Sequence, residues 1–196
     1  MGGMRMIGSR PFRRNLRTCL LAAAFAGAVG VMPAEADYAS DLTVCNTVSD
    51  KTPAEKVAAC TRLINTGQLH GKDLAAVYAN RADRYRLLEQ YDRALEDFDR
   101  AFKLNPTNPI GYINRAEVWR LKGEYDQAIA DASRAIQLDP ALNSPWTIRG
   151  MVYEKIGAIA KAREDFKHAL AIPVKANDGN WAQDVARARL KALEGK

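Results

Sequence analysis

Residues 109–142 read PIGYINRAEVWRLKGEYDQAIADASRAIQLDPAL, and this 34-residue unit decides the fold because its pattern recurs on both sides of it. Aromatic and small residues return at steps of one unit: Tyr78, Tyr112 and Trp146; Tyr85, Trp119 and Tyr153; Ala82, Ala116 and Gly150; Ala94, Ala128 and Ala162; Ala101, Ala135 and Ala169. A fixed period of this length indicates a repeat architecture, in which each unit buries its apolar face against its neighbours. The sequence therefore predicts three units, at 75–108, 109–142 and 143–176.

Each unit has the pattern of two helices joined by a turn. Leu95, Phe98 and Phe102 recur at the three- and four-residue spacing of one helical face. Gly123 stands between two such runs as a helix-ending residue. Pro106 closes the first unit, because the residue before a proline avoids the helical conformation. Each unit is therefore predicted to be a helical hairpin.

These units resemble the tetratricopeptide repeat family. The residues of the second unit that carry the resemblance are Tyr112, Ala116, Trp119, Gly123, Tyr125, Ala128, Ala135 and Pro140. The chain departs from the family pattern at Glu89, which replaces the glycine between the helices, at Ala132, which replaces an aromatic residue, and at Ile159, which replaces a tyrosine. The resemblance implies an all-α fold, a right-handed α-solenoid of helical hairpins, and a protein or peptide as the binding partner.

The segments on either side of the repeats are expected to cover the ends of the array, because a repeat array buries its core only by stacking. Residues 37–74 are interpreted as an N-terminal cap or degenerate repeat, with an amphipathic helix over 53–65. Residues 177–196 are interpreted as a C-terminal capping helix with Trp181 and Val185 on one side.

The first 36 residues have the layout of a cleaved secretory signal. Residues 1–17 carry five arginines and no acid, residues 19–32 are apolar, and residues 34–36 form a small-x-small cleavage site. A membrane anchor is the alternative, but the apolar run is shorter than the ~20 residues of a spanning helix. The sequence predicts a periplasmic or secreted protein with no membrane span after cleavage, and it leaves general secretion and twin-arginine export both open.

The net charge of +6 comes mostly from this N-terminal segment. Loss of five arginines and Glu35 reduces the basic residues from 29 to 24 and the acidic residues from 23 to 22, which leaves a net charge of +2. A nearly neutral chain with interspersed charges has no electrostatic footprint for a phosphate backbone. Nucleic acid is therefore not expected as a partner.

Cys45 and Cys60 are the two cysteines that remain after such cleavage, and a disulfide between them is the favoured interpretation. A bridge over this span would stabilise the fold by ~3 kcal/mol. Two buried free thiols or a metal site are the alternatives, although no further ligand stands at a metal-binding spacing from the pair.

No group of residues has the spacing of a catalytic site. His70 and His168 are interpreted as surface histidines, because no carboxylate, serine or cysteine is placed by its spacing to activate either one. The chain is therefore expected to act without catalysis and to hold neither a cofactor nor a metal.

Arginine recurs in the first helix of each unit, where the family more often has leucine, and aspartate recurs in the second helix. The arginines are Arg81, Arg115 and Arg149, and the aspartates are Asp97, Asp131 and Asp165. A partly buried arginine is costly unless it is paired, so the recurrence predicts one ion pair inside each hairpin. The alternative is that the three arginines line a groove for an acidic ligand.

In the tetratricopeptide repeat family the first helices of the hairpins line a concave ligand groove. The groove residues carried over by position are Asn80, Asp83, Arg86, Asn114, Glu117, Arg120, Met151 and Lys155. The asparagines are expected to hydrogen-bond a peptide backbone, the arginines to bind carboxylates, and Glu117 to discourage strongly acidic segments. The family's clamp for chaperone C-termini is not expected, because Asn114 alone matches it.

The predicted function is an exported interaction module that binds a peptide or protein segment in this groove. The alternative is a structural or assembly subunit of a cell-envelope complex that acts through its convex face or its caps. Substitutions in the groove would discriminate between the two.

Overall fold

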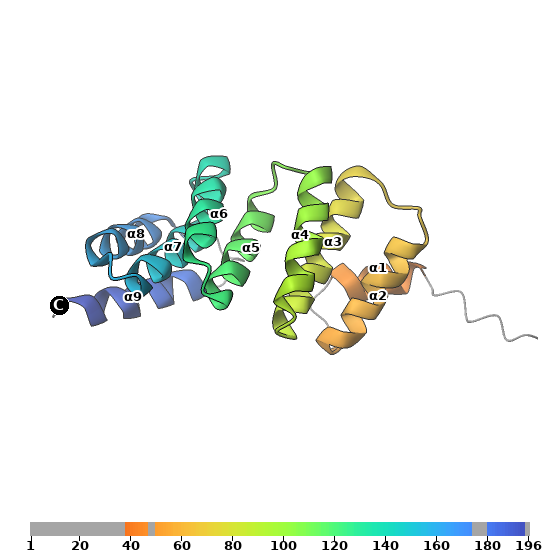
Figure 1. Cartoon of the computed structure of the whole chain (residues 1–196), viewed down its shortest axis with the longest axis horizontal. Helices are drawn as coiled ribbons and strands as arrows, with labels where there is room; N and C mark the ends of the chain where they lie inside the picture. Colours follow the sequence, from red (N-terminus) through yellow and green to blue (C-terminus); the bar gives the residue numbers. More distant parts are fainter. Residues whose placement is uncertain (1–37, 47–49, 174–179, 195–196) are drawn as a thin grey trace, which may run out of the picture. The chain divides into compact units, whose positions relative to one another are not determined.

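The computed structural model describes residues 38–46, 50–173 and 180–194, and within these ranges it contains helices and no strand (Figure 1). The helices are α1 (Tyr38–Asn46), α2 (Pro53–Asn65), α3 (Gly71–Leu87), α4 (Tyr91–Leu104), α5 (Pro109–Lys122), α6 (Tyr125–Leu138), α7 (Asn143–Lys155), α8 (Ile159–Ala171) and α9 (Trp181–Leu193). The expected signal segment, residues 1–36, lies outside the described residues. In the part of the chain that is described, no helix has both the length and the apolar character needed to cross a membrane.

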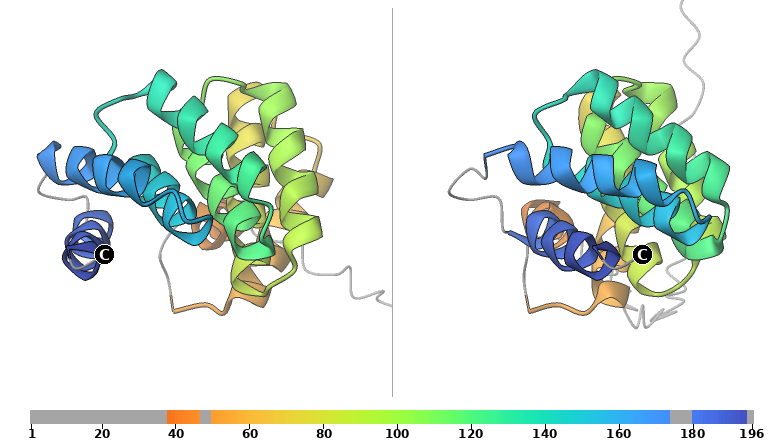
Figure 2. Two further views of the ribbon diagram at one scale, coloured as in Figure 1. Left: turned by 60° about the vertical axis from the view of Figure 1, so that its left-hand side comes forward. Right: turned by 90° about the vertical axis from the view of Figure 1, so that its left-hand side faces the viewer.

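Three helical hairpins follow one another in sequence order. Helix α3 packs against α4, α5 against α6 and α7 against α8, and each hairpin contacts the next. Helices α1 and α2 form a shorter pair against α3, while α9 lies against α7 and α8 (Figures 1 and 2). The predicted all-α solenoid of hairpins is confirmed, and helices cover both of its ends.

The first helices of the hairpins lie closer together than the second helices do. Helix α3 contacts α5, and α5 contacts α7. Between α4 and α6, or α6 and α8, there is no comparable contact among the described residues. The first helices therefore form the inner side of the row, which is where a groove is expected.

A capping box sets the start of α2. The Thr52 hydroxyl accepts a hydrogen bond from the Glu55 backbone N–H, and the Glu55 carboxylate accepts one from the Thr52 backbone N–H at 2.8 Å. The bond from the Thr52 backbone is the main reason that the pKa of the Glu55 carboxyl is lowered. Pro53 follows at the first helical position, where its missing N–H costs nothing.

The turns inside the hairpins use the left-handed backbone conformation. Gly123 ends α5 with φ 83°, and Gly157 has φ 77° after α7. Glu89 replaces glycine at the corresponding place in the first hairpin and still adopts φ 58°. A side chain in this conformation costs about 1–2 kcal/mol, which the packing of α3 on α4 must offset.

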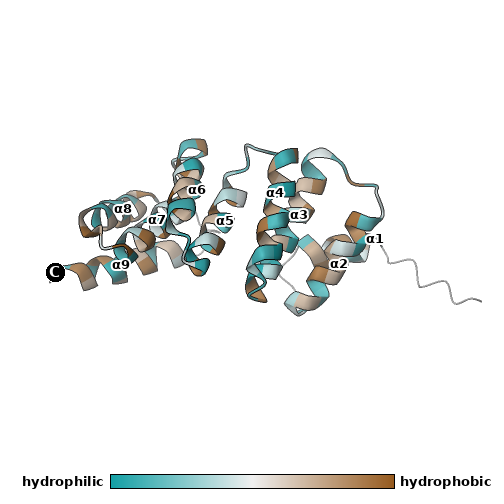
Figure 3. Ribbon diagram, in the orientation of Figure 1, coloured by the Kyte–Doolittle hydropathy of each residue, from teal (hydrophilic) through white to brown (hydrophobic). Residues whose placement is uncertain are grey.

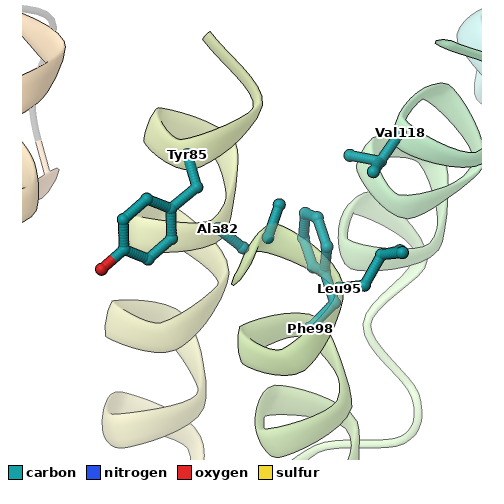
Figure 4. Close-up of a cluster of buried hydrophobic side chains, with 6 residues drawn as sticks. Ala82, Tyr85, Leu95, Phe98 and Val118 are labelled. Carbon is teal, nitrogen blue, oxygen red and sulfur yellow. The ribbon is translucent and has the colours of Figure 1, made fainter. Parts of the chain in front are cut away.

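The buried side chains form clusters between neighbouring helices, and the helices carry both hydrophobic and hydrophilic residues (Figure 3). Ala82 and Ala94 are fully buried, and their small side chains allow α3 and α4 to approach closely. The first hairpin's core cluster contains Ala82, Tyr85, Ala94, Leu95, Phe98 and Val118 (Figure 4). Since Val118 belongs to α5, this cluster joins the first hairpin to the second.

Gly150 of α7 leaves no room for a side chain against Phe166 of α8. A Cβ atom at this position would lie 2.7 Å from the Phe166 ring, a separation that real side chains do not show. Phe166 itself is fully buried, so its ring has little room to move away. The sequence pattern of small residues one period apart therefore reflects direct contact between helices.

Candidate functional site

The first of the repeated arginines forms a buried ion pair inside its hairpin. Arg81 Nε lies 2.6 Å from Asp97 Oδ2, and Arg81 Nη2 lies 2.9 Å from Asp97 Oδ1. Burial lowers the pKa of the arginine, but the hydrogen bond to Asp97 and its negative charge outweigh this effect, and the pKa is raised overall. The guanidinium is thus held as a cation in the interior.

The same two-bond geometry recurs in the other hairpins. Arg115 Nε and Nη2 lie 2.7 and 2.9 Å from the Asp131 carboxylate oxygens. Arg149 Nε and Nη2 lie 2.8 Å from those of Asp165. The hydrogen bond to Asp165 raises the pKa of Arg149, while burial acts in the opposite direction. The structure thus contains all three of the ion pairs that the sequence predicts.

Each arginine also reaches the second helix of the preceding unit. Arg81 Nη1 donates to Thr61 Oγ1 at 2.9 Å. Arg115 Nη1 donates to Asp99 Oδ1 at 2.6 Å, and Arg149 Nη1 donates to Ser133 Oγ at 2.9 Å. Sequence reasoning missed these acceptors, although Asp99 and Ser133 stand one repeat period apart. Every arginine therefore joins three helices, and each of its three guanidinium nitrogens donates a hydrogen bond within the array. Arg81 lines a cavity of about 250 Å³ between α2, α3 and α4, whereas none of the three lines either of the two cavities on the inner side of the array.

Cys45 of α1 and Cys60 of α2 lie at disulfide-bonding distance, with their sulfur atoms 2.16 Å apart and both side chains fully buried. Arg62 Nε also donates to Asp41 Oδ2 at 2.8 Å, which gives the two helices a polar contact beside the sulfur bridge. No group of three potential metal ligands is present among the described residues. The geometry matches the disulfide interpretation of these cysteines.

A cavity of about 400 Å³ opens on the inner side of the array. Its lining residues come from four helices: Arg86, Ile113, Asn114, Glu117, Ser144, Ile148 and Trp181. Ile113 and Ile148 are buried and form its apolar floor, whereas the Trp181 indole is 51% exposed at its edge. The side-chain amide of Asn114 has no hydrogen-bond partner among the described residues, so it is free to donate and to accept.

A second cavity of about 280 Å³ lies further along the same helices. It is lined by Arg120, Met151, Glu154, Lys155, Ile159 and Arg189. Arg189 lies 3.7 Å from Glu154, but Lys155 has no ion-pair partner in the part of the chain that the structure describes. The cavity therefore combines apolar side chains with a cation that is not neutralised.

The arginines expected to bind carboxylates already hold one each. Arg120 makes two bonds of 2.7 Å to Glu117, and these bonds raise its pKa. Arg86 donates to Asp83 Oδ1 from Nε at 3.0 Å and from Nη2 at 2.8 Å. A ligand carboxylate would have to compete with these neighbours. Their three-residue spacing along a helix is a signal that could have predicted the pairing.

Two of the expected groove residues line neither cavity. Asn80 donates from Nδ2 to Asn46 Oδ1 of α1 at 2.8 Å, and Asp83 is held by Arg86 and Arg84. The other six are divided between the cavities, with Arg86, Asn114 and Glu117 in the larger one and Arg120, Met151 and Lys155 in the smaller one. The structure therefore places the open part of the groove between α5, α7 and α9.

Helix α9 supplies two site residues that sequence reasoning did not assign. Trp181 edges the larger cavity, and Arg189 edges the smaller one. The capping helix follows the last repeat, so the 34-residue period carries no information about it. Its packing also covers Thr147, whose hydroxyl donates to the Ala182 carbonyl at 3.0 Å.

Comparison with protein-family models finds the tetratricopeptide repeat three times. One model matches residues 75–108 and 109–142, and a second model of the same repeat matches residues 144–173. Together these matches cover half of the chain. Among curated protein sequences, none matches it.

Several solved structures have the same fold. A crystal structure of MamA protein has 21% identity and a TM-score of 0.60, over 69% of this chain and 72% of that one. YrrB, described as a TPR protein with an unusual peptide-binding site, has 18% identity and a TM-score of 0.59, over 71% and 66%. The second TPR domain of human RPAP3, solved with the HSP70 peptide SGPTIEEVD, has 24% identity and a TM-score of 0.55, over 64% and 100%.

Proposed function

Because the chain belongs to the tetratricopeptide repeat family, we propose that it is an exported interaction module that binds an extended peptide segment of a protein partner. The observation that carries this proposal is the 400 Å³ cavity on the inner side of the array. An apolar floor with a few free polar groups around it is the usual make-up of a binding site. The proposed role is binding without catalysis.

Polar groups of the cavity suit a peptide backbone. The free amide of Asn114 offers a donor and an acceptor, which is what an extended backbone requires of its binding site. Ser144 adds a hydroxyl at the cavity edge. Bonds to the backbone give affinity with little demand on sequence, so selectivity must come from the pockets for side chains.

Two structural relatives support a peptide as the ligand class. The RPAP3 domain was solved with a peptide, and YrrB is described by its peptide-binding site. The chaperone-tail clamp is not part of the proposal, because Ala79, Asp83, Ser144 and Ile148 occupy four of its positions. The partner proposed here is recognised by other residues.

Export to the periplasm or the cell exterior is the setting that fits the N-terminal sequence. The basic, apolar and small-residue regions of residues 1–36 support it. The Cys45–Cys60 pair supports it as well, because disulfides persist in oxidising compartments. N-terminal sequencing of the protein from its own cells is expected to begin at Asp37, and a native N-terminus at residue 1 would contradict export by cleavage.

Filling the cavity tests the binding function. Asn114→Trp places a large side chain in the cavity from a half-exposed position, so the fold is expected to persist. Selection from a library of random displayed peptides should yield binders for the original protein, and Asn114→Trp should abolish their binding. Lys167→Trp on the exposed side of α8 is the matched control.

Retained binding by Asn114→Trp would contradict the groove as the site. It would favour the alternative function, an assembly subunit of an envelope complex that uses its convex face or caps.

A further inference from the structure

The two cavities lie at successive levels of the same helices, α5, α7 and α9, and the surface that carries both is called the trough here. Ile148 lines the larger cavity, and Lys155 lines the smaller one. These residues are seven apart on α7, so they share a helical face and are separated by about 10 Å along the axis. Ile113 and Arg120 have the same relation on α5. The trough therefore has two ends of different chemistry at a defined separation.

One end of the trough is apolar. The Trp181 indole is half exposed, and the side chains of Ile113 and Ile148 lie in the floor beside it. An exposed tryptophan next to a buried aliphatic floor offers a large surface that a ligand side chain can cover, and such positions commonly dominate binding energy. An aliphatic or aromatic side chain is the ligand group that fits this end.

The other end of the trough has an excess of one positive charge. Glu117 holds Arg120 through two bonds, and Arg189 lies beside Glu154. Lys155 is then the cation without a counterion among the described residues. Met151 and Ile159 line the same cavity and reduce its contact with water, which strengthens an ion pair formed there. A single carboxylate complements this end.

We propose that this trough is a two-part site that recognises one apolar side chain and one acidic side chain three residues apart in an extended peptide. The inference rests on the proposed peptide-binding function. In a polyproline II conformation each residue advances 3.1 Å and the side chains repeat every three residues. Residues i and i+3 then project from one side about 9 Å apart, which matches the separation of the two ends.

The acidic group comes from a side chain and not from a chain terminus. Lys155 is the last residue of α7, so the backbone groups nearest to it are the carbonyl acceptors of a helix C-terminus. Capture of a terminal carboxylate commonly uses backbone N–H donors. A flexible lysine provides a point charge, which suits a side-chain carboxylate. Glu117 and Glu154 would repel any second acid nearby.

Fluorescence polarisation with labelled synthetic peptides tests the proposal. Each peptide carries one leucine and one glutamate in a glycine–serine background, with free and amidated C-termini, in both orders and with the separation varied. The i, i+3 peptides in one order are expected to bind most tightly. Replacement of glutamate by glutamine in the best peptide is expected to weaken binding about tenfold, and amidation of the C-terminus is expected to have no effect.

Variants of the full chain locate the two ends. Lys155→Glu should weaken binding of the glutamate peptide about tenfold and leave binding of the glutamine peptide unchanged. Trp181→Ala should weaken binding of both peptides to the same extent, because both carry the leucine. Lys167→Glu on α8 makes the same charge change outside the trough, and Leu104→Ala removes an exposed apolar side chain from α4. Both control variants should bind the peptides normally.

The outcomes separate this inference from the proposed function. Equal binding at every separation, or normal binding by Lys155→Glu and Trp181→Ala while Asn114→Trp loses it, would overturn the two-part site and keep the groove. Loss of binding on amidation would overturn the side-chain source of the carboxylate. Absence of binding by every peptide, or normal binding by Asn114→Trp, would overturn the groove itself.

Discussion

The two ends of the array are covered by different means. At the N-terminal end, α1 is joined to α2 through the buried Cys45–Cys60 pair and to α3 through the Asn46–Asn80 hydrogen bond. At the C-terminal end, the Leu193 side chain of α9 packs in a buried cluster with Phe166, and Gln183 donates a hydrogen bond to the Ile172 carbonyl at 2.6 Å. Both ends use packing and polar contacts, and the sulfur bridge is the feature that distinguishes the N-terminal end among the described residues.

Helix length explains part of the difference. Helix α1 has nine residues, and a helix this short is not stable by itself, so it needs fixed links to its neighbours. Helix α9 has 13 residues and buries Ala182, Ala186 and Leu193. Its packing leaves Trp181 exposed at the edge of the trough. The end without a sulfur bridge among the described residues is therefore also the end that contributes to the proposed binding site.

The largest expected effect comes from the ion pair next to the N-terminal cap. Asp97→Ala would leave the Arg81 guanidinium buried without its carboxylate, and this arginine also bonds Thr61 of α2. Breaking a buried pair on one side costs about 3–5 kcal/mol. Urea unfolding should show this loss in the free energy of unfolding. The control is Glu164→Ala, an exposed acid on α8, which should change it by less than about 0.5 kcal/mol.

At the C-terminal end, Leu193→Ala removes a fully buried side chain from the contact between α9 and α8. Truncation of a buried leucine costs about 2–5 kcal/mol, and we expect a loss of about 3 kcal/mol because the helix end can partly close the space. Peptide binding should weaken in parallel, since α9 carries Trp181. Leu104→Ala on α4 is the exposed control, and equal losses in the two variants would contradict the packing account.

Reduction of the Cys45–Cys60 pair should act at the N-terminal end alone. The cysteines are 15 residues apart, and opening such a loop lowers the free energy of unfolding by about 3 kcal/mol. Peptide affinity should stay the same, because the trough lies at the other end of the array. Denaturant titrations with and without reductant measure the first effect, and the polarisation assay measures the second. A large loss of affinity on reduction would show that the N-terminal cap takes part in binding.

The smallest expected effect concerns the start of α2. Thr52→Ala removes the cap hydrogen bond to the Glu55 backbone and should cost about 1 kcal/mol. The folded pKa of Glu55 lies below its unfolded value, so its contribution is present above the unfolded pKa and is lost as the pH falls through the folded pKa. The difference in the free energy of unfolding between the original protein and Thr52→Ala should therefore shrink in acid. A difference that grows as the pH falls would contradict the capping role.

The repeat architecture was predictable because the same few contacts recur three times. Arg81 and Asp97 could be paired from the amino-acid sequence alone, since a charged residue at an interior repeat position needs a partner. The period also extends into residues 37–74, which the sequence indicates as a cap or degenerate repeat. Asn46, Asn80 and Asn114 stand one period apart, and the first two bond each other, so α1 takes the place of a first helix.

The binding surface was predictable only in part. Positions in a repeat indicate which residues face inward, but not whether their charges are already satisfied. Arg86 and Arg120 are held by acids three residues away along their own helices. The contribution of Trp181 depends on how the cap packs after the last repeat, and no sequence period specifies that arrangement.

A charge exchange between Lys155 and its peptide tests whether the acidic side chain of the ligand lies at Lys155. Affinities would be measured for the original protein and for Lys155→Glu, each with the best leucine–glutamate peptide and with its lysine counterpart. We expect the original protein to prefer the glutamate peptide and Lys155→Glu to prefer the lysine peptide, with a coupling energy of about 1 kcal/mol or more. The same preference in both proteins would contradict the placement of the ligand's acidic side chain at Lys155.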